Sequence, residues 1–162
     1  MLEWLESTQF SAWTRGESIW GWPFALTVHA FGTAIVIGYI FIINLRLLGI
    51  FRTIPYSSLN RLFTFIWIAF VFQFLSGFTL WMTKPRRYVT DGAFLAKFSL
   101  VIIGVGVTLY FSETMKREAA SWEAAGGVSP RGVKFVAATF LVWCGVLVAG
   151  RLTAYLGTLY AG

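Results

Sequence analysis

The chain has 162 residues and is strongly apolar, because 57% of them are hydrophobic, 19% are aromatic and only 12% are charged. This composition excludes an ordinary soluble domain and indicates a membrane protein. The formal net charge of +6 does not call for a nucleic-acid partner, since basic loops beside anionic membrane lipid are the ordinary reason for such a charge.

The first 18 residues mix Trp, Leu and Phe with three Glu and one Arg. They lack the basic start and the short apolar core of a signal peptide. We expect a short interfacial helix that lies along the membrane surface, and an ordered tail whose aromatic rings touch the headgroups is the alternative.

Four long apolar segments follow, separated by short segments that carry the charges. Each is near the length that spans a hydrocarbon core of ~30 Å. Their apolar residues run continuously, without the alternation of a barrel strand. The sequence therefore predicts an all-α membrane protein, a four-transmembrane-helix up-and-down bundle that forms a single domain over residues 1–162. The predicted spans are approximately 20–45, 62–82, 94–111 and 135–156.

The basic residues indicate the orientation of this bundle. Seven of them flank the loops that follow the first and third spans, and four lie on the other side. Because positive loops stay in the cytoplasm, we expect loops 46–61 and 112–134 inside and both termini outside. The seven are Arg46, Arg52, Arg61, Lys116, Arg117, Arg131 and Lys134, and the four are Arg15, Lys84, Arg86 and Arg87.

Three further residues carry a titratable or charged group inside the spans: His29, which is the only histidine, Lys97 and Arg151. Such groups are costly in lipid and suggest function. At a rise of 1.5 Å per residue they lie about 10, 9 and 6 Å below the nearest residues that mark the outer surface. The predicted topology therefore places all three in one layer of the outer half of the membrane.

This layer suggests a haem site. Small residues, among them Gly32, share the helix face of His29 and leave room for a flat group. An imidazole nitrogen is a standard axial ligand of haem iron, and cations such as Lys97 and Arg151 suit the propionates. We therefore predict a b haem with His29 as its metal ligand. The second axial position stays open between Met82, Lys97 and His29 of a second protomer.

Simpler interpretations of the same residues remain. Lys97 and Arg151 are long enough to extend their charges to the headgroups while their stems stay in lipid. His29 can be a buried neutral ring that is hydrogen-bonded to a Ser, a Thr or a backbone carbonyl, and small residues also serve close helix packing. Gln73 and Asn44 are candidates for hydrogen bonds between helices.

A resemblance to a known family rests on four segments: ESIWGWPFALTVHAFGTAIVIG, NLRLLGI, LSGFTLWMTKPRRYVTDGAFLAKFSL and WCGVLVAGRLTAYLG. They resemble small, largely uncharacterised bacterial inner-membrane proteins with four helices, over nearly the whole chain, and this resemblance implies no function. More distantly, His29 and Lys97 are similar to residues of the CopD-like copper-resistance proteins and the HemJ-like protoporphyrinogen oxidases. That similarity implies b haem, although the chain lacks their additional histidines.

The sequence leaves several functions open. All carboxylates lie outside the spans, so no Ser, His and Asp set can form within them, and the single cysteine, Cys144, excludes an intrachain disulfide and a cysteine metal cluster. The first hypothesis is electron transfer between the quinone pool and an outer-side partner, or a related oxidation of a porphyrin. The alternative is a non-catalytic structural or assembly subunit of a larger membrane complex, and a homo-oligomer is compatible with both. A channel lined by Lys97 and Arg151 is less favoured.

Overall fold

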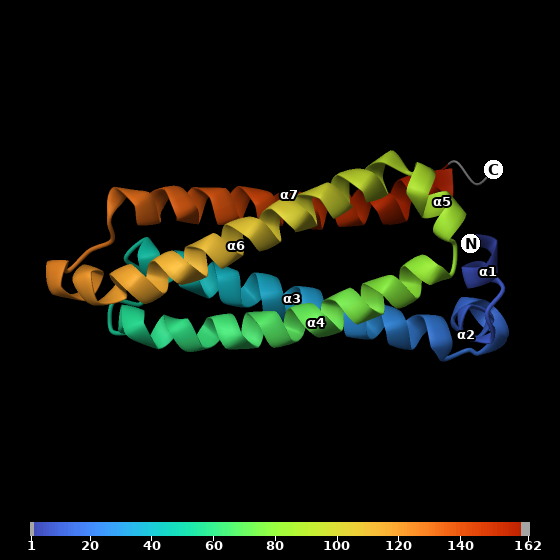
Figure 1. The fold of residues 1–162 in the computed structure, drawn as a ribbon, viewed down its shortest axis with the longest axis horizontal. Coiled ribbons are helices and arrows are strands. Elements are labelled where there is room, and N and C mark those ends of the chain that lie inside the picture. Colours follow the sequence, from blue (N-terminus) through green and yellow to red (C-terminus); the bar gives the residue numbers. More distant parts are fainter. Residues whose placement is uncertain (1, 160–162) are drawn as a thin grey trace.

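The predicted helical bundle is confirmed by a computed structural model, which describes residues 2–159, apart from the side chains at 154 and 156–159. The ends of the predicted domain, residue 1 and residues 160–162, lie outside that description. Within it no strand occurs, and four long helices run antiparallel to their neighbours in the chain (Figure 1). These helices are α3 (Gly21–Leu47), α4 (Asn60–Met82), α6 (Gly92–Ala125) and α7 (Pro130–Leu159).

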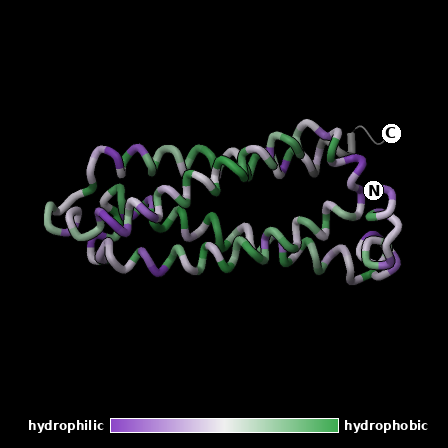
Figure 2. Tube along the Cα trace, in the orientation of Figure 1, coloured by the Kyte–Doolittle hydropathy of each residue, from purple (hydrophilic) through white to green (hydrophobic). Residues whose placement is uncertain are grey.

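All four helices are long and apolar enough to cross a membrane, and an apolar stretch of 18 residues in each has a mean hydropathy between 1.8 and 2.1. Figure 2 shows the apolar residues along the middle of the helices and the hydrophilic ones gathered toward their ends. A helix satisfies its own backbone hydrogen bonds, which is what a chain in lipid requires. The structure thus supports a multi-pass membrane protein.

Helix α6 is longer than predicted, because residues 112–125 were expected in a loop and are helical. Met115, Ala119 and Trp122 bury one face of this extension, at the spacing of a single helix stripe. Glu113 and Lys116 form an ion pair on its exposed side. The helix ends at Gly126, whose positive φ of 66° suits a glycine after a helix.

The N-terminal segment is not one helix but three short pieces, α1 (Leu2–Glu6), α2 (Gln9–Ala12) and a π-helical turn, η1 (Trp13–Glu17). The Ser11 hydroxyl donates to the carbonyl of Met82 at 3.1 Å, and Arg15 donates to the carbonyl of Thr83 at 3.4 Å. These bonds fix the segment against the end of α4.

Two short elements complete the fold: η2 (Tyr56–Leu59) between α3 and α4, and α5 (Pro85–Thr90) between α4 and α6. We call the end of the bundle with η2 and the α6–α7 loop the loop end, and the end with α1, α2 and α5 the terminal end. The buried core joins both hairpins in the half nearer the loop end, from Val36 to Leu47 on α3 and from Val136 to Val146 on α7. The ribbons of the two hairpins diverge toward the terminal end (Figure 1).

Candidate functional site

His29 lies on α3 in the terminal half and is half-buried against α4. Its Nδ1 is 3.2 Å from the hydroxyl of Ser76, and its Nε2 is 3.1 Å from the amide nitrogen of Gln73. The Ser76 hydroxyl donates its own hydrogen to the carbonyl of Phe72 at 2.8 Å, so it accepts from Nδ1. The Nε2 lone pair then accepts from Gln73. Both ring nitrogens are therefore engaged by α4.

Thr33 completes this group of side chains. Gln73 donates from the same amide nitrogen to the Thr33 hydroxyl at 2.6 Å, and that hydroxyl donates to the carbonyl of His29 at 2.8 Å. We call His29, Thr33, Gln73 and Ser76 the polar cluster. Its bonds confirm that Gln73 joins two helices. Among the described residues, the buried oxygen of the Gln73 amide has no hydrogen-bond partner.

Two glycines allow α3 and α4 to approach at this level. A Cβ at Gly32 would lie 2.6 Å from the Gln73 amide oxygen and 3.2 Å from its Cα, and one at Gly77 would lie 3.0 Å from Cε1 of His29. Small residues permit such contacts between membrane helices. The space beside Gly32 that was predicted to hold a flat ligand is therefore occupied by Gln73.

Lys97 is the second predicted site residue near His29. Its half-buried side chain packs on α7, where its ammonium nitrogen lies 3.7 Å from the position of a Cβ at Gly150. It is within electrostatic range of the His29 ring. In the part of the chain that the structure describes, the Lys97 ammonium makes no hydrogen bond or ion pair. The charge of Lys97 is thus left without a partner of opposite sign.

Two groups near the start of α6 do not neutralise this charge. The Asp91 carboxylate caps the helix, because it accepts from the backbone N–H groups of Ala93 at 2.8 Å and Phe94 at 3.2 Å. Tyr88 packs on Phe94 with ring centroids 5.1 Å apart. Burial raises the pKa of Tyr88 above its ordinary value of 10.0, so its phenol is neutral at physiological pH.

The remaining predicted site residues lie apart from the polar cluster. Arg151 has an exposed side chain on α7. Met82 is the last residue of α4, six positions beyond Ser76, which corresponds to about 9 Å along a helix. The structure thus leaves Arg151 at the surface, whereas His29 and Lys97 are half-buried.

The haem prediction can be compared with this geometry. An iron at either nitrogen of His29 would have to displace Ser76 or Gln73, and Gln73 also fills the face beside Gly32. The residues therefore do not fit an axial histidine in the arrangement described. Within residues 2–159 no three His, Cys, Asp or Glu side chains gather into a metal site. The haem stays a prediction that requires Gln73 to move.

A second cluster of contacts, at the loop end, was not predicted from the sequence. Arg46 is only 6% exposed, its guanidinium lies 3.9 Å from the ring centre of Tyr56, and its Nε donates to the carbonyl of Ile54. The Glu123 carboxylate accepts from the backbone N–H groups of Tyr56 at 3.1 Å and of the next residue at 3.4 Å. A single arginine in the apolar NLRLLGI segment was the available signal. These contacts tie the α3–α4 loop to α6.

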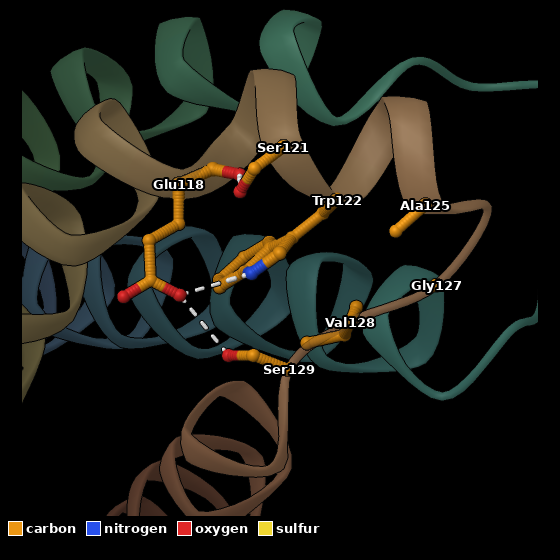
Figure 3. A pocket seen from close by; sticks show the side chains of 7 residues that line it. All are labelled: Glu118, Ser121, Trp122, Ala125, Gly127, Val128 and Ser129. Atoms are coloured by element: carbon orange, nitrogen blue, oxygen red, sulfur yellow. Dashed lines mark hydrogen bonds between the residues drawn. The ribbon is translucent and has the colours of Figure 1, made fainter.

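A hollow of about 450 Å³ lies beside the α6–α7 loop (Figure 3). There the Glu118 carboxylate accepts from the Trp122 indole N–H and from the Ser129 hydroxyl, both at 3.0 Å. The bond from Ser129 ties the α6–α7 loop to α6. The lining residues are Glu118, Ser121, Trp122, Ala125, Gly127, Val128 and Ser129.

Replacing Glu118 with leucine is expected to lower the free energy of unfolding by about 1–3 kcal/mol, because the buried Trp122 indole and the half-buried Ser129 hydroxyl lose their acceptor. A thiol-reactive dye that reports exposure of Cys144 during heating in detergent measures the change. Glu113→Leu, which removes only an exposed ion pair on the same helix, is the control and should change stability by less than about 1 kcal/mol. Equal losses in the two variants would contradict the assignment.

Comparisons of the chain with protein-family models, with curated proteins and with solved structures find no match.

Proposed function

We propose that the chain is a non-catalytic structural or assembly subunit of a larger membrane complex, located in the bacterial inner membrane with both termini in the periplasm. The observation that carries this proposal is the polar cluster, in which both nitrogens of the only histidine hold α4 against α3. A histidine whose two ring nitrogens both bond to a neighbouring helix is a helix-packing residue. Nucleophilic or metal chemistry would need one of its nitrogens to be free.

The inference that a partner protein packs against this chain rests on Lys97. An ammonium group among apolar helices needs a counter-charge, and the described part of the chain provides none. Large apolar side chains such as Phe31, Phe72 and Phe98 are more than half exposed in the same half of the bundle. An apolar helix of another protein that carries Asp or Glu would satisfy both features.

Affinity purification of the tagged chain after chemical cross-linking in a mild detergent tests this function. We expect a partner at fixed stoichiometry whose apolar span carries a carboxylate. Lys97→Met should lower its recovery at least fivefold, whereas Lys116→Met at the loop end and His29→Gln should retain it. A chain that stays monomeric, or whose partner is indifferent to Lys97→Met, would rule out the proposal.

The second candidate is a b-haem protein that moves electrons between the quinone pool and an outer-side partner, or that oxidises a porphyrin. The observation in its favour is the buried Gln73 amide oxygen, which has no hydrogen-bond partner among the described residues, since a side chain that is not fully hydrogen-bonded is more easily displaced by a ligand. Its test is an optical spectrum of the purified protein, oxidised and reduced. A Soret band that is lost in His29→Ala would favour the haem, and a colourless protein from haem-sufficient cells would remove it.

A further inference from the structure

A groove of about 450 Å³ lies between α3 and α7 in the half of the bundle nearer the loop end. Its lining is apolar except for Asn44. The rings of Phe41 and Phe140, which line it from the two helices, stack with centroids 5.2 Å apart. Leu45 on α3 and Ala137 on α7 also contribute to the lining. The groove therefore suits a long apolar group such as an acyl chain.

Asn44 is the one polar residue of this lining, and only 2% of it is exposed. Its amide oxygen accepts from the Thr139 hydroxyl at 3.1 Å, which confirms the predicted interhelical bond. Its amide nitrogen has no partner among the described residues. A buried donor left unpaired destabilises the protein. A ligand with a carbonyl oxygen at this level would accept a hydrogen bond from the Asn44 amide nitrogen.

A cation lies near one end of the groove. Lys134 has an exposed side chain and follows Val133, a lining residue in the first turns of α7. Basic residues beside gaps between membrane helices recognise anionic lipid headgroups. Lys134 is nearer the loop end than the Phe41 and Phe140 pair, so the order from the membrane surface inward is cation, amide and apolar surface.

We propose that this groove binds one anionic phospholipid. Its phosphate lies at Lys134, an ester carbonyl accepts from the Asn44 amide, and an acyl chain lies along the stacked Phe41 and Phe140. A phospholipid presents phosphate, ester carbonyl and hydrocarbon in this same order. The groove opens on the apolar surface of the bundle, so the ligand enters from the bilayer itself.

Native mass spectrometry of the delipidated protein in detergent, titrated with palmitoyl-oleoyl phosphatidylglycerol, tests the proposal. We expect one lipid to bind at low concentration. Ala137→Phe fills the groove and should weaken this binding at least tenfold. Ala96→Phe places the same ring on an exposed position of α6 and should leave it within twofold. Equal affinities of wild type and Ala137→Phe would overturn the site.

Two further pairs test the polar contacts without filling the groove. Asn44→Leu should weaken phosphatidylglycerol binding about fivefold, whereas Thr139→Val, which removes the hydroxyl beside the Asn44 oxygen and leaves the Asn44 amide nitrogen in place, should not. Lys134→Ala should lower the affinity for phosphatidylglycerol to that for phosphatidylcholine. No preference between these two lipids in the wild-type protein, or displacement of the lipid by equimolar decylubiquinone, would overturn an anionic phospholipid as the occupant.

Discussion

Replacing Gly32 with alanine is expected to lower the free energy of unfolding by about 1–3 kcal/mol, the usual cost of forcing extra volume into a packed interface. The new Cβ would meet the Gln73 amide oxygen at 2.6 Å and the Cα of Gln73 at 3.2 Å. The side chain can rotate, but the backbone of α4 can yield only by moving away from α3. That movement breaks the bonds from Gln73 to His29 and Thr33. Unfolding in mixed micelles, followed by Cys144 accessibility, measures the loss.

Gly38→Ala is the matched control for Gly32→Ala. Gly38 lies on the same helix, and no heavy atom lies within 4 Å of the position of its Cβ. Alanine is the better helix former by up to about 1 kcal/mol, so this variant should be neutral or stabilising. If both variants destabilised the protein equally, the loss would result from alanine within α3 itself, and the contact with Gln73 would not explain it.

The four long helices were predictable because the apolar composition of the chain indicates that lipid surrounds it. Lipid requires about 20 continuous apolar residues in each crossing, and the observed helices contain all four predicted spans except residue 20. The end of α6 was not predictable from hydropathy, since residues 112–125 are polar although they remain helical. The spacing of Met115, Ala119 and Trp122 was the signal that this segment continues one buried face.

The sequence predicted the depth of the site residues in the membrane, but it did not predict which side chains they contact. The rise per residue placed His29 and Lys97 at one level, and the structure brings them within electrostatic range. The partners of His29 depend on the register between α3 and α4, which η2 and its contacts with Arg46 and Glu123 help to fix. No local pattern in the sequence states that register. The sequence therefore predicted that Gln73 forms a hydrogen bond between helices, but not which residue is its partner.

A double-mutant cycle between His29 and Gln73 is expected to give a coupling energy of about 1–2 kcal/mol. His29→Leu removes the acceptor of the Gln73 amide and the donor to Ser76, so it should cost about 1–3 kcal/mol. Gln73→Leu should cost a similar amount, and the double variant should lose less than the sum. His29→Gln should retain most of the stability, because its amide can both donate and accept. The free energies come from the same unfolding measurement in mixed micelles.

The cycle separates the two functions considered for His29. Thr79→Val removes a hydroxyl of α4 that bonds only within its own helix and should cost less than about 0.5 kcal/mol, which sets the scale for a polar loss without an interhelical partner. A histidine that acted only as an iron ligand would show no coupling with Gln73, and its replacement would remove colour before stability. A large coupling in a colourless protein is the outcome that a helix-packing histidine requires, because the energy then resides in the bond between α3 and α4.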